Sequence, residues 1–499
     1  MSIDYSYKDI EWCQRVFNKS EECFCDAGII VPDSMDDIAK VLCVKALPSV
    51  TDSKCENGRV TVSGQVKITV LYIGENENGR VFTLNTTQPF SHTITSVDIT
   101  EDCIPRIRAL SAGVNHTFVN SRRIKLNAII RLLVSCYREN RSKVLTKAAG
   151  AELLTAEKAF LAARSICTKS IIITDNAELG SGKAPVCNIL NSHIRISDCD
   201  FKALNNKVIA KGNLSLSVLY STSDNLSDAS FTIPFTEVLE AEGVAPSLLT
   251  NVTLSVADCE IRPDTDLSGE YRMLDVNVVL TAHITSSSEE KVTAVTDLFL
   301  PGGAVNATAL PITVTSAITP LCEEEFIRGS ISLPPTAPSF SRILDTECNI
   351  CDVTLSDSAA MGNAEVSIMY LSSDMAINTY TAKIPVTHKF AHTSLSDLWC
   401  EVKHIGYAIT GDNSLEVRLS VNFHANHTAG EPLTLISDCT EEEYNPPSRP
   451  SVIVSFVNAG DSLWSIAKKH NIALSKLALA NALDENSILT VGEKLIIPR

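Results

Sequence analysis

Hydrophobic and polar side chains alternate along residues 59–73, RVTVSGQVKITVLYI. Val60, Val62, Val66, Ile68, Val70 and Tyr72 share one parity, and Thr61, Ser63, Gln65, Lys67 and Thr69 take the other. A period of two places one face of a strand on a core and the other in water, as in an antiparallel sheet. The pattern predicts a long β-strand, and a glycine in its interior, Gly64, is typical of a bulge or bend.

The same element occurs three times in the chain. Residues 207–221, KVIAKGNLSLSVLYS, and residues 357–371, DSAAMGNAEVSIMYL, repeat the order of glycine, alternating segment and tyrosine. Tyr72, Tyr220 and Tyr370 each follow a glycine by eight residues. Because the tyrosines lie roughly 150 residues apart, they indicate an internal repeat.

Two further elements recur in each copy. A proline-containing strand follows the tyrosine, with the sequences QPFSHTI, IPFTEVL and IPVTHKF. A strictly alternating strand then closes the copy, at residues 124–132, 274–280 and 415–423. Each copy is long enough to bury a core of its own. We therefore expect a mainly β protein with three tandem sandwich- or barrel-like repeat domains.

Repeat spacing and segment composition give the expected domain boundaries. Residues 1–20 form an N-terminal segment, residues 21–150, 165–300 and 322–438 form the repeats, and residues 452–499 form a separate module. Residues 151–164 are predicted to be a short connecting helix, because Ala159, Phe160 and Ala163 fall at helical spacing. Residues 301–321 and the acidic, proline-rich residues 439–451 are predicted to be linkers.

Charge and hydropathy narrow the classes of function. The chain has 42 Lys/Arg and 59 Asp/Glu, a net charge of −17, so nucleic acid would be repelled over most of the surface. The first residues, MSIDYSYKDIEW, lack the basic start and apolar core of an export signal. No stretch approaches the roughly 18 consecutive apolar residues of a membrane span. We expect no nucleic-acid partner, no transmembrane segment and a protein that stays where it is made.

Residue patterns that carry enzyme or metal chemistry are sparse. The sequence has no phosphate-binding loop, nucleophile elbow or zinc-protease motif. Cys348 and Cys351 form one isolated CxxC, and His388 and His392 share a predicted strand face without a carboxylate or cysteine at ligand spacing beside them. We expect no catalytic residue, no metal and no cofactor.

The pattern changes after residue 452. Two short alternating segments, VIVSFV and KLIIP, flank two stretches with helical spacing. Asp461 and Ser462 both suit the N-cap of the first helix, with Asp461 the expected cap, and Leu474 or Ser475 opens the second helix. The segments GDSLWSIAKKHNI, LALAN and ILTVGEKLIIP resemble a LysM domain, which implies a small βααβ fold.

The resemblance to LysM domains also implies a binding site. LysM domains bind the N-acetylglucosamine backbone of peptidoglycan or chitin, between the loop after the first strand and the loop before the last. On this chain those loops carry Gly460, Asp461, Ser462 and Leu463, and then Ile488, Leu489, Thr490 and Val491. Trp464, in the first helical turn, is expected in the core. A protein partner would cover a broader, basic face that includes Lys468 and Lys469.

The three repeats resemble the SPOCS domain of spore-coat-associated proteins from endospore-forming bacteria, over residues 21–438. Three such repeats before a LysM domain resemble the SipL-type spore morphogenetic proteins of clostridia. That resemblance implies a non-enzymatic structural adaptor in the mother-cell cytoplasm, at the forespore surface and in the spore coat. It also implies that the LysM domain binds a SpoIVA-type coat ATPase. Repeats that pack into a shell allow self-association as well.

Two alternatives keep the usual LysM ligand. The first is a protein that binds peptidoglycan in the cell wall or cortex. The second is an enzyme that its LysM domain delivers to the wall, and the lack of any catalytic motif disfavours it. Binding to a protein or to a glycan therefore separates the two leading interpretations.

Overall fold

The computed structural model describes residues 4–75, 80–223, 225–445 and 453–498. Most of these residues lie in β-strands, and the two short helices found among them both belong to the C-terminal module. The predicted fold class, mainly β with a small βααβ module at the end, is confirmed. No helix within the described ranges is long and apolar enough to cross a membrane.

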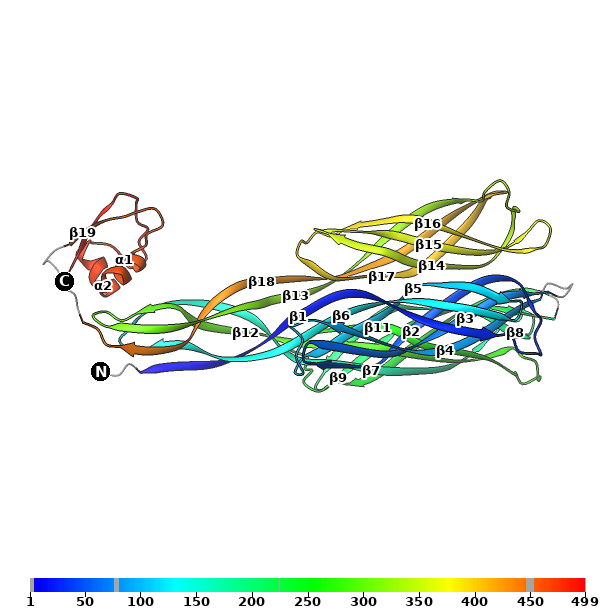
Figure 1. Ribbon diagram of the computed structural model, residues 1–499, viewed down its shortest axis with the longest axis horizontal. Helices are drawn as coiled ribbons and strands as arrows, with labels where there is room; N and C mark the ends of the chain where they lie inside the picture. The colour runs from blue at the N-terminus through cyan, green and yellow to red at the C-terminus, as the bar shows by residue number, and fades with distance from the viewer. Residues whose placement is uncertain (1–3, 76–79, 224, 446–452, 499) are drawn as a thin grey trace.

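Three units with the same order of strands follow one another along the chain (Figure 1). The first unit comprises β1 (Tyr5–Ile30), β2 (Ile38–Glu56), β3 (Arg59–Gly74), β4 (Val81–Thr95), β5 (Ile104–Asn120) and β6 (Arg123–Ala148). The second comprises β7 (Glu152–Glu178), β8 (Asn188–Leu204), β9 (Lys207–Ser221), β10 (Leu226–Glu240), β11 (Leu249–Asp264) and β12 (Met273–Phe299). The third comprises β13 (Ala304–Ser332), β14 (Phe340–Ser356), β15 (Ala359–Ser372), β16 (Ile377–Lys389), β17 (Leu395–Gly411) and β18 (Ser414–Glu442).

Each unit is a sandwich of two antiparallel sheets. In the first unit the sheet β2-β3-β4 packs against the sheet β1-β6-β5, and the other two units repeat this order. The strand with the alternating pattern lies in the middle of its sheet, and Tyr72, Tyr220 and Tyr370 are at most 1% exposed. Each tyrosine belongs to a cluster of buried residues drawn from both sheets. The repeated strand therefore supplies the centre of each core.

The repeated glycine allows a neighbouring strand to approach closely. Register shifts occur in the strand opposite each glycine, between Val50 and Asp52, Ser197 and Asp200, and Cys351 and Thr354. A Cβ atom on Gly64 would lie 2.3 Å from the carbonyl oxygen of Ser49 and 2.6 Å from Phe90 Cζ. The predicted bulge is confirmed, but the extra residues are on the partner strand, and the glycine is needed for space.

Three long hairpins extend beyond the sandwiches as two-stranded ribbons. The first ribbon pairs residues 5–14 with 138–148, the second pairs 152–163 with 287–299, and the third pairs 304–319 with 427–442. The third strand of each sheet ends before the ribbon begins, because β5, β11 and β17 pair only with the inner part of β6, β12 and β18. Figure 1 shows the ribbons running together away from the sandwiches, and we call them the three-ribbon bundle.

The ribbons correct several expectations about the connecting segments. Residues 151–164 contain no helix, because β7 begins at Glu152 and pairs continuously with β12. Phe160 is buried in a cluster shared by all three units, and this non-local packing outweighs the helical spacing of its neighbours. Residues 1–20 and 301–321 likewise lie largely within β1 and β13. In the predicted linker 439–451, residues 439–442 end β18, whereas residues 446–451 lie outside the described residues.

The three units pack around a shared axis. One cluster joins Leu71, Leu219 and Met369, each of which directly precedes the buried tyrosine of its unit. Because equivalent positions of three repeats meet in one cluster, the arrangement is close to threefold. Two further clusters hold the ribbons together, one around Trp12, Phe160 and Leu435 and one nearer the ribbon tips around Leu145, Leu298 and Ile436. The shared core therefore links segments that are hundreds of residues apart in sequence.

Candidate functional site

The C-terminal module has the predicted order of elements. It contains β19 (Ile453–Phe456), α1 (Leu463–His470), α2 (Leu474–Ala480) and β20 (Lys494–Ile497), and the two strands pair antiparallel. Its core buries Leu463, Ile466, Ala467, Leu477 and Leu495, with both helices against the small sheet. The alternating hydrophobic positions of the two strands and the helical spacing between them thus form the core of a compact βααβ module.

The two loops of the predicted binding groove adjoin each other. The amide of Val457 donates a hydrogen bond to the carbonyl oxygen of Glu493 at 2.9 Å, and the amide of Gly492 donates to the carbonyl oxygen of Val457 at 2.8 Å. Gly460 turns the first loop with a φ of +89°, a left-handed conformation that favours glycine. The amide of Thr490 donates to Glu493 Oε2 at 2.9 Å and fixes the second loop. We call these loops, residues 458–462 and 488–491, the groove rim.

The predicted site residues differ widely in exposure. Gly460, Ser462 and Thr490 are exposed, and Ile488 and Val491 are 96% and 67% exposed. Asp461 is half-buried, and its carboxylate accepts a hydrogen bond from the amide of Asn458. Leu463 is 2% exposed, and Leu489 packs against the module core. Leu463 and Leu489 therefore anchor the two loops in the module core, whereas the side chains of Ile488 and Val491 are exposed to solvent.

The N-cap of α1 is Ser462, and the expectation of Asp461 is wrong. The amide of Ser465 donates to Ser462 Oγ at 3.1 Å, and the amide of Ser462 donates to Ser465 Oγ at 2.9 Å, which completes a capping box. Ser462 has the extended backbone of a cap residue, with φ at −125° and ψ at 163°. Asp461 instead closes the turn that precedes the helix.

Replacing Ser462 with alanine is expected to destabilise the module. The loss of the cap should cost about 0.5–2 kcal/mol of the free energy that keeps α1 folded. Hydrogen exchange of the α1 amides in the full chain measures this loss. Ser475→Ala is the matched control, because Ser475 is exposed near the start of α2 and α2 has no side-chain cap. An equal loss in both variants would contradict the capping assignment.

The module docks on the tip of the three-ribbon bundle. Trp464 Nε1 donates a hydrogen bond to Asp297 Oδ2 at 2.8 Å, and its ring meets Phe299 edge-on with centroids 5.1 Å apart. Lys468 Nζ pairs with the other carboxylate oxygen of Asp297. Asn471 Nδ2 donates to the carbonyl oxygen of Gly303 at 2.7 Å. Helix α1 and the turn after it therefore hold the module against the ends of the ribbons.

Docking changes the roles expected for Trp464 and the two lysines. Trp464 is half-buried and bridges the module to the repeats, so it lies at an internal interface rather than only in the module core. Both lysines are exposed, but among the described residues only Lys468 forms an ion pair, with Asp297. Sequence reasoning missed the docking residues Asp297 and Phe299. No local pattern marks them, although they directly precede the turn at residues 301–303 between the second and third units.

The histidine and cysteine candidates lie apart from this site. His388 is held between Glu323 and Glu325, at 2.9 and 3.1 Å, and its ring stacks on Phe423. His392 instead lies beside His427, so the pair predicted to share a strand face is not brought together. Burial raises the pKa of the Cys348 thiol to about 12 and also raises that of Cys351, which keeps both thiols protonated. Within the described part of the chain, no group of three metal-ligating side chains is arranged to hold an ion.

Comparison with protein families matches both parts of the chain. The model of the SipL SPOCS domain matches residues 37–119 and 185–264, and the model of the LysM domain matches residues 457–498. The SPOCS matches fall in the first and second units, so two of the three predicted repeats are matched. The third unit has the same strand order and pairing. No curated protein and no solved structure matches the chain.

The two domain types give the class of the protein. SPOCS domains belong to proteins associated with the spore coat, and LysM domains are modules of a peptidoglycan-binding type. Both are binding or adaptor domains rather than catalytic ones. The architecture found in the structure, β-sandwich units followed by a βααβ module, agrees with these matches. The chain contains two regions that match the SipL SPOCS domain and a C-terminal LysM domain, a combination that matches a SipL-type protein.

Proposed function

We propose that this protein is a non-enzymatic adaptor in spore coat assembly, which encases the forespore from the mother-cell cytoplasm. Its LysM domain binds a SpoIVA-type coat ATPase through the groove rim. The observation that supports a protein partner is the apolar rim itself, where Ile488 and Val491 are 96% and 67% exposed. Contiguous exposed apolar surface is typical of interaction sites, and Ile488 and Val491 lie three positions apart on one loop.

Docking on the ribbons supports the same proposal. The contacts with the ribbon tips come from Trp464, Lys468, Asn471 and Leu474, whereas the rim lies on other loops. The rim therefore stays exposed in the full chain while the domain is held by α1. A fixed domain with an open rim presents a binding surface without the entropic cost of ordering a free domain.

Binding to peptidoglycan is the second candidate function. The observation that favours it is the juxtaposition of small polar groups, on Ser462 and Thr490, with the apolar Ile488 and Val491 on adjoining loops. Acetamido groups carry both a hydrogen-bonding amide and a methyl group, so such a rim suits them as well. The two candidates use the same loops and differ in the ligand.

The test compares the full chain with a double variant, Ile488→Arg with Val491→Arg. Both side chains are exposed, so the fold should persist while the apolar rim is lost. We expect capture of a purified SpoIVA-type ATPase to weaken about tenfold or more, because central apolar contacts dominate interface energies. Leu267→Arg, at a fully exposed turn of the second unit, is the control and should bind normally.

Cosedimentation with insoluble peptidoglycan is measured in parallel. Retention of the wild-type chain on the glycan, with no capture of the ATPase, would replace the adaptor proposal with the glycan one. Lys469→Glu then tests how far a protein partner extends along α1, since Lys469 is exposed. Lys468 is unsuitable for this purpose, because its reversal would also break the contact with Asp297.

A further inference from the structure

A cavity lies where the three β-sandwich units meet. Its volume is about 900 Å³, and its walls come from β1, β5 and β6 of the first unit, β8, β11 and β12 of the second, and β13, β14, β17 and β18 of the third. Pockets of this size accommodate small molecules. The site exists only because three repeats are assembled in one chain, and it lies on the repeats rather than on the LysM domain.

Two arginines of β5, Arg106 and Arg108, line this cavity. The guanidinium carbon of Arg108 lies 3.8 Å from the centroid of the Trp399 ring. Arg106 Nη2 donates a hydrogen bond to the neutral Thr253 Oγ1 at 3.2 Å. Among the described residues neither arginine forms an ion pair, whereas Arg15, in the same cavity, pairs with Asp397 at 2.7 Å. The unpaired guanidinium groups are notable in a chain with a net charge of −17.

Burial and the closeness of the two guanidinium groups make it unfavourable to keep both arginines charged. Burial, together with the nearby Arg106, lowers the pKa of Arg108 to about 10. Burial and the two arginines lower the pKa of His283 to about 3, so the imidazole is neutral at physiological pH. Five Lys/Arg and three Asp/Glu side chains line the described walls, which leaves an excess of positive charge. Glu401, which also lines the cavity, opposes the lowering of the Arg108 pKa but does not outweigh burial and Arg106, so an anion at this place would relieve the remaining repulsion.

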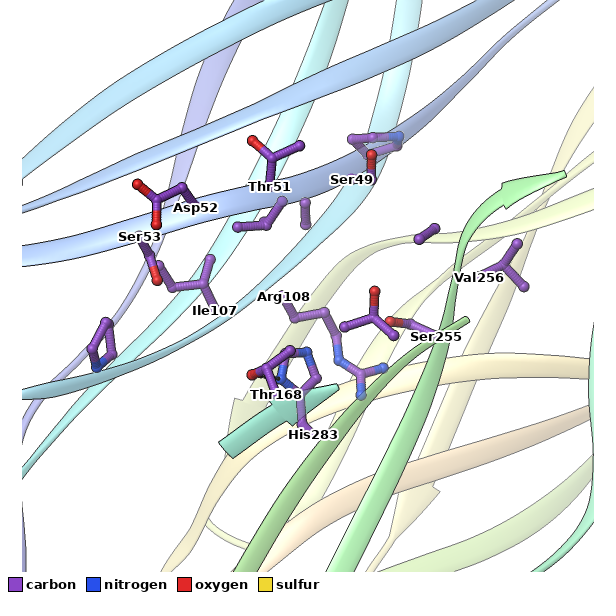
Figure 2. Close-up of a pocket in the computed structure, with 16 residues that line it drawn as sticks. Ser49, Thr51, Asp52, Ser53, Ile107, Arg108, Thr168, Ser255, Val256 and His283 are labelled. Carbon is purple, nitrogen blue, oxygen red and sulfur yellow. Dashed lines mark hydrogen bonds between the residues drawn. The ribbon is translucent and has the colours of Figure 1, made fainter. Parts of the chain in front are cut away.

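Polar donors gather beside the arginines. Figure 2 shows Arg108 with Ser255, Thr168 and His283 in the adjoining pocket between the first two units, which has a volume of about 200 Å³. Thr168 Oγ1 lies 3.1 Å from His283 Nδ1. Stacking on Trp399 covers one face of the Arg108 guanidinium and leaves its N–H edge for hydrogen bonds. Guanidinium edges match the geometry of carboxylate and phosphate oxygens.

We propose that the cavity between the three β-sandwich units binds a small anionic ligand, with a carboxylate or phosphate group held by Arg106 and Arg108. Trp399 orients the Arg108 guanidinium, and the neighbouring hydroxyl groups offer further hydrogen bonds. This ligand site is separate from the groove rim and does not depend on the proposed adaptor function.

The test titrates the full chain with inorganic phosphate and, separately, with citrate, by calorimetry and by tryptophan fluorescence at constant ionic strength. We expect saturable binding of at least one anion, with a fluorescence change that is lost in Trp399→Phe. Arg108→Gln should weaken binding about tenfold or more, because it removes charge-assisted hydrogen bonds. Binding of citrate alone identifies a carboxylate site, and binding of phosphate alone identifies a phosphate site.

Arg262→Gln is the matched control, since Arg262 is an exposed arginine of β11 that pairs with Glu260. It should bind like the wild type. Both anions also stabilise proteins by exclusion from the surface, so a rise in melting temperature that is equal in all variants does not support the site. If Arg108→Gln does not fold, Arg106→Gln takes its place. The proposal is overturned if neither anion binds saturably, or if the cavity and control variants bind alike.

Discussion

Replacing Tyr220 with alanine is expected to lower the free energy of unfolding by about 3–5 kcal/mol, as large-to-small truncations of buried aromatic residues do. The side chain is 0% exposed and lies at the centre of the core of the second unit. Tyr72→Ala and Tyr370→Ala should have similar costs, because these residues occupy the same place in the first and third units. Chemical denaturation of the full chain measures the loss.

The tyrosine hydroxyl groups provide a sharper comparison. Tyr72 donates a hydrogen bond to the carbonyl oxygen of Asp36 at 3.0 Å, and Tyr370 donates to that of Pro338 at 3.1 Å. The buried Tyr220 hydroxyl has no partner among the described residues. Tyr72→Phe and Tyr370→Phe should therefore cost about 0.5–1.5 kcal/mol each, and Tyr220→Phe should cost nothing or stabilise the protein. A loss in Tyr220→Phe as large as in the other two would refute this difference.

Replacing Asp345 with alanine is expected to destabilise the junction between the second and third units by about 2–5 kcal/mol, because two buried donors lose their acceptor. His193 Nε2 lies 2.9 Å from Asp345 Oδ1, and Asn191 Nδ2 donates to Asp345 Oδ2 at 2.6 Å. The side chains of His193 and Asp345 are only 10% and 15% exposed. Glu416→Ala, which removes a surface ion pair with Arg418, is the control and should cost less than about 1 kcal/mol.

The same carboxylate predicts how stability depends on pH. Burial alone would raise the pKa of Asp345, but His193, Lys45 and Asn191 together lower it from 3.8 to about 2. Because the folded state holds this carboxylate charged, its contribution is complete above about pH 5 and is lost as the pH falls from about 4 to 2. Acid unfolding of Asp345→Ala should therefore depend less on pH in this range than unfolding of the wild type. Parallel curves for both proteins would contradict the assignment.

Local periodicity was sufficient to predict the strands and the module. The alternation before Tyr72 defines a strand with one buried face, and Gly64 correctly marks a bulged pairing. The choice between Asp461 and Ser462 as N-cap was not decided by residue type, because both side chains cap helices well. The extended backbone of Ser462 in the structure identifies this residue as the N-cap.

Contacts between the repeats could not be predicted from the sequence patterns. Ala159, Phe160 and Ala163 fit a helix locally, yet Phe160 packs with side chains of the other two units and forms part of a strand. Trp464 fits a helix core, yet its indole N–H reaches Asp297, which is 167 positions away. The sequence suggests three independent units, whereas the clusters shared between them favour joint unfolding. Arg106 and Arg108 share a strand face, but no pattern reveals that other units surround them.

The three-ribbon bundle separates two different ends of the molecule. The sandwiches lie at one end and the LysM domain at the other (Figure 1). In a layer of copies that are all attached through the same end, every copy would expose its other end on the same side of the layer. The separation between the ends depends on the length of paired strands, at about 3.3 Å per residue, and not on the number of repeats. Inserting matched residue pairs into all three ribbons would move the LysM domain outward while preserving both ends. The thickness of such a layer is therefore encoded in the length of three hairpins.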